Sequence, residues 1–108
     1  MGIHFSNGLG FLYVKEMDQP IAKVSYQLTE TDPTKYTKKK WWGELYTNKE
    51  VKSVNEVGTH RIEFEDGRKG ECVIWVNTEA KQGRSSHFYY HFNGRSKLSR
   101  DSRDRRRG

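Results

Sequence analysis

The chain has 108 residues, of which 32% are hydrophobic, 13% aromatic and 31% charged. That length allows one domain with a single thin core, and no apolar run approaches the length of a membrane-spanning helix. The net charge of +6 is concentrated at the end of the chain, because residues 95–108 hold seven Lys and Arg against two Asp, whereas residues 1–94 hold 13 against 12. The body is therefore almost neutral, and the overall charge does not make it a basic nucleic-acid binder.

The N-terminal region is the least decisive part of the sequence. It contains the glycine-rich run Asn7-Gly8-Leu9-Gly10, and residues 11–14 are either a short strand or an apolar arm that packs on the domain. Residues 1–20 are therefore treated as a candidate packing arm. The first residues lack the charged and apolar regions of a signal peptide. We expect a cytoplasmic protein, although a mature secreted chain would have the same features.

The first clear strand covers residues 21–28, where apolar and polar side chains alternate, as in a strand with one buried face. Residues 41–47 predict a second strand, with Trp41 and Trp42 on opposite faces. Between them lies a polar connection that includes three consecutive lysines. In residues 48–58 the valines are three apart, which fits either a single helical turn or a loop with anchored valines.

Two further strands, residues 59–65 and 68–77, are joined at Asp66-Gly67, a strong hairpin signal. A two-residue loop would place apolar and charged residues on the same face. A three-residue loop keeps the apolar residues together, and it requires Gly67 in the left-handed region. We therefore predict the three-residue loop, whose opposed residues are Phe64 with Arg68, Ile62 with Gly70 and His60 with Cys72.

The last strand covers residues 87–92, with three aromatic residues on one face and His87, Tyr89 and His91 on the other. Five strands without an amphipathic helix longer than one turn predict an all-β fold. The fold class is a small antiparallel barrel or sandwich of five to six strands. We predict a single β domain over residues 1–98 and a disordered Arg-rich tail over residues 99–108.

Catalytic and metal-binding chemistry finds little support in the sequence. His87 and His91 are four apart, but in a strand that separation is about 13 Å, too far for two ligands of one zinc ion. Cys72 is the only cysteine and lies in the most apolar strand, where a buried, unreactive thiol is expected. We predict no catalytic residues, no metal, no cofactor and no enzymatic activity.

Two binding surfaces remain as hypotheses. If the last strand lies beside the hairpin, then Trp75 shares an outer face with Tyr89, His87 and His91, and such an aromatic platform is typical of protein interfaces. The competing interpretation is that residues 11–14 fold across this face. The preferred hypothesis is a protein-interaction module, with its oligomeric state open.

The alternative is a single-stranded nucleic-acid binder that uses the segment from Lys38 to Trp42 and the basic tail. Lysines that meet phosphates beside aromatic rings that stack on bases are typical of such proteins. The structural interpretation of the same segment is a solvated lysine loop followed by tryptophans of the core. The candidate residues are Lys38, Lys39, Lys40, Trp41 and Trp42.

The hairpin Glu65-Asp66-Gly67-Arg68, with Gly70 two residues on, is followed by Phe92-Asn93-Gly94 and then Leu98. This pattern over roughly the last forty residues of the predicted domain resembles an uncharacterised group of small bacterial β domains. Residues 95–97 depart from the small-residue and proline ending of that group. The resemblance implies a β domain of bacterial type and no particular activity.

Overall fold

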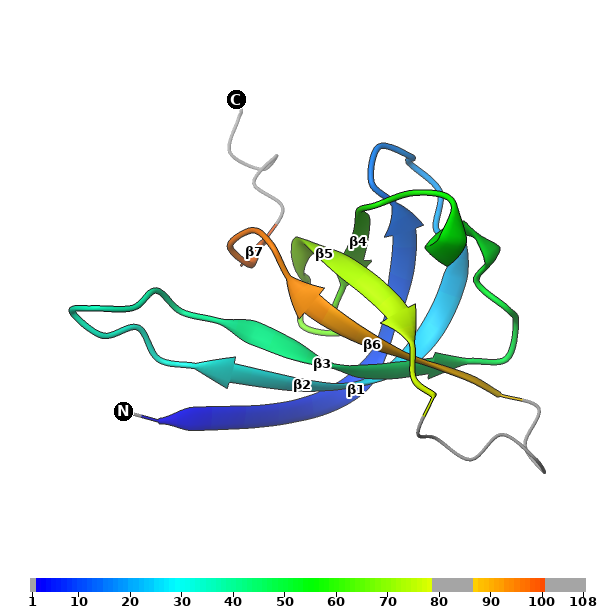
Figure 1. Ribbon diagram of the computed structural model, residues 1–108. Helices are drawn as coiled ribbons and strands as arrows, with labels where there is room; N and C mark the ends of the chain where they lie inside the picture. Colours follow the sequence, from blue (N-terminus) through cyan, green and yellow to red (C-terminus); the bar gives the residue numbers. More distant parts are fainter. Residues whose placement is uncertain (1, 79–86, 101–108) are drawn as a thin grey trace.

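The computed structural model describes residues 2–78 and 87–100, and almost all of its regular structure is β (Figure 1). A short 3₁₀ helix, η1 (Lys52–Asn55), lies between the third and fourth strands. The strands are β1 (Ile3–Val14), β2 (Ala22–Thr31), β3 (Trp41–Thr47), β4 (His60–Glu63), β5 (Arg68–Val76), β6 (Phe88–Gly94) and β7 (Ser99–Arg100).

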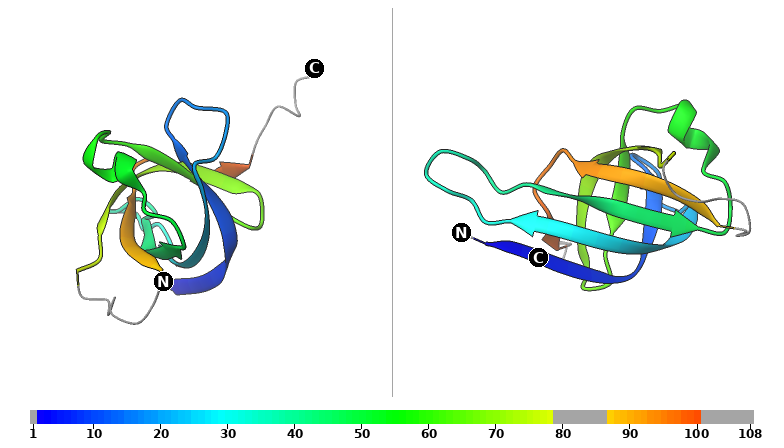
Figure 2. Two further views of the ribbon diagram at one scale, coloured as in Figure 1. Left: turned by 90° about the vertical axis from the view of Figure 1, so that its right-hand side faces the viewer. Right: turned by 60° about the horizontal axis from the view of Figure 1, so that its bottom comes forward.

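Six of these strands form a closed antiparallel barrel, which confirms the barrel rather than the sandwich. The strand order is β4-β1-β2-β3-β6-β5, and pairing of β4 with β5 closes the ring, as the left-hand view of Figure 2 shows. β1 to β4 form a Greek key, because β4 returns after a longer connection to lie beside β1. The two-residue strand β7 pairs with the start of β5 outside the ring.

The N-terminal region is a full strand of the barrel and not a packing arm. β1 pairs with β2 over residues 3–12 and with β4 over residues 11–14. Gly10 permits this path, because a side chain there would overlap the backbone carbonyl of Glu63. Of the two interpretations of residues 11–14, the strand is therefore confirmed, and the candidate packing arm over residues 1–20 is corrected. The glycines that obscured the alternation allow β4 to approach β1 closely.

The β4–β5 hairpin has the predicted three-residue loop. His60 is opposite Cys72 and Ile62 is opposite Gly70. The N–H of Phe64 donates to the carbonyl of Arg68 (2.8 Å), and the N–H of Gly67 donates to the carbonyl of Phe64 (2.9 Å). Gly67 has a φ of 92°, so the left-handed residue also stands where the register argument requires it.

The barrel interior is built around aromatic rings. The ring of Phe64 lies 4.7 Å from that of Tyr26, 5.9 Å from that of Trp41 and 6.0 Å from that of Phe92. Around this centre pack aliphatic side chains and the lone cysteine. The most deeply buried of these residues are Leu12, Val24, Leu28, Leu45, Ile62 and Cys72.

The connection between β3 and β4 contains the single helical turn that the valine spacing allowed. Val51 is buried, and its N–H donates to the hydroxyl of Tyr90 (2.9 Å). Val54, in η1, packs against the core, whereas Val57 is exposed. Two of the three valines therefore anchor this segment to the barrel.

The predicted start of the disordered tail is corrected, since Ser99 and Arg100 are ordered. They pair as β7 with Lys69 and Arg68, and Nε of Arg100 donates to the carbonyl of Asp66 (3.2 Å). The remainder of the predicted tail, residues 101–108, lies outside the described residues.

Part of the sheet extends beyond the barrel. The first half of β1, the end of β2 and the connection to β3 project past the ring on the side of the N-terminus (Figures 1 and 2). Residues 3–7 are exposed on both faces of the sheet. This extension carries one wall of the surface described next.

Candidate functional site

Outward-facing side chains from neighbouring strands form three rows across the barrel. The register places Asn7, Gln27, Glu44, His91 and Trp75 in the middle row. We call the first four residues the polar row. The row on one side contains Phe5, Thr29, Trp42 and Asn93, and the row on the other side contains Leu9, Ser25, Tyr46 and Tyr89.

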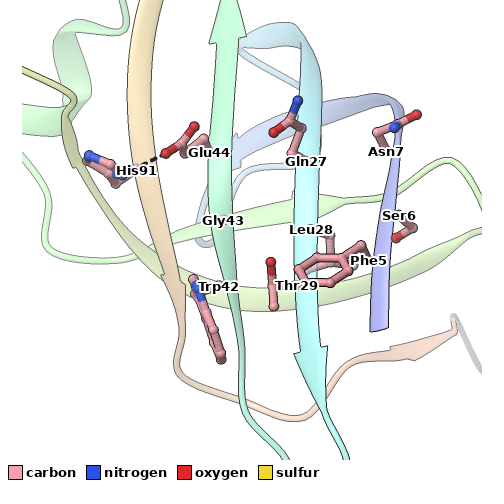
Figure 3. A pocket seen from close by; sticks show the side chains of 10 residues that line it. All are labelled: Phe5, Ser6, Asn7, Gln27, Leu28, Thr29, Trp42, Gly43, Glu44 and His91. Atoms are coloured by element: carbon pink, nitrogen blue, oxygen red, sulfur yellow. Dashed lines mark ion pairs between the residues drawn. The ribbon is translucent and has the colours of Figure 1, made fainter. Parts of the chain in front are cut away.

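A groove of about 580 Å³ lies over the polar row and the neighbouring row that contains Phe5, Thr29 and Trp42. Figure 3 shows Phe5, Thr29 and Trp42 next to one another, with the polar row alongside. A second hollow of about 440 Å³ shares three residues of the polar row and reaches Tyr46 and Tyr89. Together these two hollows are the outer groove, which has polar side chains along its middle and aromatic rings on both sides.

The polar row offers donors and acceptors of several kinds. The carboxylate of Glu44 lies 3.8 Å from Nδ1 of His91, a pair that is ionic when the imidazole is protonated. The side chains of Asn7 and Gln27 add two neutral amides to the same row. Among the described residues that line the two hollows there is no Lys or Arg, and Glu44 is the one acidic residue.

The structure places the predicted platform residues on this outer face. The Trp75 side chain is 45% exposed, and its ring centroid lies 5.4 Å from that of His91. The rings of Tyr89 and His87 lie 5.4 and 5.0 Å from that of Tyr46. β1 does not cover them, because β2 and β3 separate it from β6. The competing interpretation, an arm folded across this face, is therefore wrong, and the binding role of the platform stays a prediction.

Several residues of the groove were missed by the sequence analysis. Phe5 is 77% exposed and Tyr46 is 40% exposed, and neither was a candidate. The signal for Phe5 was present, because the odd positions from residue 3 to residue 13 are apolar or aromatic with the sole exception of Asn7. For the polar row there was no signal, since its members come together only through the pairing of four strands.

The lysine segment is divided between surface and core. Trp41 is only 4% exposed, and its Nε1 donates to the carbonyl of Ser96 (2.7 Å). Trp42, on the opposite face, is 38% exposed and lines the groove. Trp41 is therefore removed from the candidates for base stacking, because its ring fills the barrel interior.

The three lysines also differ in their surroundings. Nζ of Lys39 lies 3.1 Å from a carboxylate oxygen of the buried Glu30. The two carboxylate oxygens of Glu30 also accept hydrogen bonds from the guanidinium of Arg68 at 2.8 and 2.9 Å. These contacts lower the pKa of Glu30 to about 2. All three lysines are exposed, but Lys39 is paired with Glu30, so Lys38 and Lys40 are the better placed of the three to meet a ligand.

Burial shifts the pKa values of two core side chains, Cys72 and His60. Burial raises the pKa of Cys72 to about 12, so its thiol stays protonated at neutral pH. Burial lowers the pKa of His60, and Nε2 of this residue lies 2.8 Å from Oγ of Ser53. Across residues 2–78 and 87–100 no three His, Cys, Asp or Glu side chains are grouped so as to hold a metal ion.

Within the same ranges, no helix has the length and apolar character needed to cross a membrane. No family model, curated protein or solved structure matches this chain. The function is therefore inferred from the geometry and chemistry of the outer groove.

Proposed function

We propose that this chain is a non-catalytic binding module that takes an extended segment of a partner protein in the outer groove. The observation that carries the proposal is the pair of aromatic walls beside a polar row. Phe5 and Trp42 stand on one side of the row, and Tyr46 and Tyr89 stand on the other. Phe5, Trp42 and Tyr46 are exposed and Tyr89 is half-buried. Aromatic rings left exposed together are typical of protein interfaces.

The chemistry of the groove favours a protein segment over a nucleic acid. Aromatic walls bury apolar side chains of a ligand, while a few placed polar groups fix its orientation. The amides of Asn7 and Gln27 can pair with peptide groups, and Glu44 can accept from a donor of the partner. A phosphate backbone in the same place would meet the carboxylate of Glu44 and, in the part of the lining that the structure describes, no Lys or Arg.

The proposal is tested by selecting displayed peptides against the full chain and titrating an enriched synthetic peptide. Trp42→Ala should weaken binding at least tenfold, because truncation of a central aromatic anchor typically costs 2 kcal/mol or more. Tyr36→Ala is the matched control: this aromatic residue is 87% exposed but lies outside the groove. Equal affinities for Trp42→Ala and wild type would contradict the proposal.

A second candidate function is binding of single-stranded nucleic acid beside Trp42. It is favoured by the exposed Lys38 and Lys40, which precede this exposed ring, and by the basic residues at the end of the chain. Binding of a labelled oligothymidylate should then fall steeply with salt. The double substitution Lys38→Gln and Lys40→Gln should reduce both the affinity and the salt dependence. Binding that is absent, or insensitive to these changes, would reject this candidate.

A further inference from the structure

The first half of β1 has one edge without a partner strand. β2 pairs with β1 along residues 3–12, whereas β4 reaches only Phe11–Val14 on the opposite edge. Among the described residues no other strand pairs with β1. Figure 1 shows this segment beside β2, projecting past the barrel. Ile3–Asn7 is therefore an edge strand, although the ring itself is closed.

The hydrogen bonds show which backbone groups face the free edge. The carbonyls of Gly2 and Leu12 accept from Asp32 and Ile21 on the β2 side (3.1 and 2.7 Å). The N–H of Leu9 points to the other side, where it donates to Oε1 of Glu65 (2.9 Å). The N–H and C=O groups of one residue point to the same edge of a strand, and successive residues alternate between the two edges. The odd-numbered residues of β1 therefore point to the free edge. The free groups belong to Ile3, Phe5 and Asn7.

The side chains of this edge do not discourage pairing. Protein edge strands are commonly protected by Lys, Pro, a bulge or a covering loop. Ile3–Asn7 contains no Lys, Arg, Asp, Glu or Pro, and its pairing with β2 is regular from residue to residue. Ile3 is 57% exposed and Phe5 is 77% exposed. The edge thus has two exposed apolar side chains, no Lys or Pro, a regular pairing and no cover on either face.

We propose that a second copy of this chain pairs with this edge, so that two β1 strands run antiparallel about a twofold axis at Phe5. Ile3 then lies opposite Asn7 of the second copy, and the two Phe5 residues face each other. Each opposed pair can exchange both N–H···O=C bonds, because all the residues involved are at outward-facing positions. A strand edge is self-complementary, as a twofold interface requires.

Charge and shape favour a copy of the chain as the occupant. The segment contains no Asp, Glu, Lys or Arg that would repel its own copy, and His4 lies 2.8 Å from Asp32, the residue that follows β2. Residues 1–94 have a net charge of only +1. Opposed residues of an antiparallel pair point to the same face. The rings of the two Phe5 residues would therefore touch, and the two outer grooves would form one continuous surface. With the proposed function, a partner that carries two binding segments would occupy both grooves and bind more tightly than a partner with one.

Sedimentation equilibrium of the full chain over a wide concentration range tests the pairing. The average mass of the wild type should rise from that of one 12.7 kDa chain towards twice that value. Phe5→Lys should remain monomeric throughout, because two lysines would face each other. Leu9→Lys is the matched control: Leu9 is exposed on the same strand and face, but its N–H is occupied by Glu65. It should associate like the wild type.

Hydrogen exchange tests the backbone geometry directly. The amides of Phe5 and Asn7 should become protected as the concentration rises, whereas that of Leu9 should not change. Phe5→Pro removes an outward N–H, leaves the pairing with β2 intact and should give a monomer that melts close to the wild type. The proposal would be overturned if the wild type stayed monomeric or if Phe5→Lys formed a dimer. A wild-type dimer whose Phe5 and Asn7 amides exchange as fast as in the monomer would also overturn it.

Discussion

The indole of Trp41 occupies the space in which a side chain at Gly94 would lie. A Cβ at position 94 would overlap the Cε2, Cδ2 and Nε1 atoms of Trp41. The ring is also held by the hydrogen bond from its Nε1 to the carbonyl of Ser96 (2.7 Å). Because both the backbone of β6 and the indole are fixed, neither can yield to an added methyl group.

Gly94→Ala should therefore destabilise the protein by about 2–3 kcal/mol, as overpacking of a rigid core does. Urea denaturation of both proteins measures the difference. Gly58→Ala is the control, because a Cβ at Gly58 has no neighbour within 4 Å, and it should be almost neutral. Equal destabilisation by the two substitutions would show that the indole is not a rigid obstacle.

Gly67 provides a second test of the backbone. With a φ of 92° it occupies a region that a β-branched residue adopts at a cost of about 1–2 kcal/mol. Gly67→Val should lower the free energy of unfolding by that amount, measured in the same urea titrations. An unchanged stability would mean that the loop relaxes to another turn.

The carboxylate of Glu30 accepts two hydrogen bonds from the guanidinium of Arg68. Glu30→Gln should cost about 2 kcal/mol, because the partly buried guanidinium loses one counter-charge and keeps only Asp66, 2.9 Å away. The pKa of Glu30 falls from 4.5 to about 2, so this stabilisation is complete above pH 4.5 and is lost as the pH falls towards 2. The difference between wild type and Glu30→Gln, followed by chemical denaturation, should shrink over that range. Glu50→Gln, at an exposed position, should have little effect.

His60 should control stability at a higher pH. Burial lowers its pKa below the ordinary value of 6.5, so folding favours the neutral imidazole. Stability is then full above pH 6.5 and decreases as the pH falls through 6.5 towards the folded pKa, because the unfolded chain binds the proton first. The melting temperature of the wild type should drop over this interval, and His60→Gln should reduce the drop. His91→Gln, on the outer face, should retain it.

The sequence predicted those parts of the fold that depend on local alternation and turn chemistry. The range of β3 and the opposite faces of Trp41 and Trp42 followed from the period of two, and the hairpin register followed from keeping apolar residues on one face. β1 was not recognised, because Gly8 and Gly10 interrupt its alternation. Glycine is needed at these two positions because the β4–β5 hairpin approaches β1 closely. This is a tertiary contact, and no local sequence pattern predicts it.

The candidate site was less predictable than the fold. The outer positions of Trp75, Tyr89 and His91 could be deduced once β6 was placed beside β5. The polar row could not, because Asn7, Gln27 and Glu44 come from three strands whose relative register is fixed by the barrel. Lys39 looked like its neighbours in the sequence, and only its contact with the buried Glu30 distinguishes it.

The central claim, recognition of a protein segment in the outer groove, is tested most directly by the three indole N–H resonances of the ¹⁵N-labelled chain. On titration with a selected peptide, the signal of Trp42 should shift, because its exposed ring lines the groove. The signal of Trp75 should shift too, because its ring lies 5.4 Å from that of the groove residue His91. The signal of Trp41 should stay in place, since its N–H is bonded to Ser96. Shifts confined to the lysine segment and the C-terminal residues, with the Trp42 and Trp75 indoles unmoved, would contradict the claim.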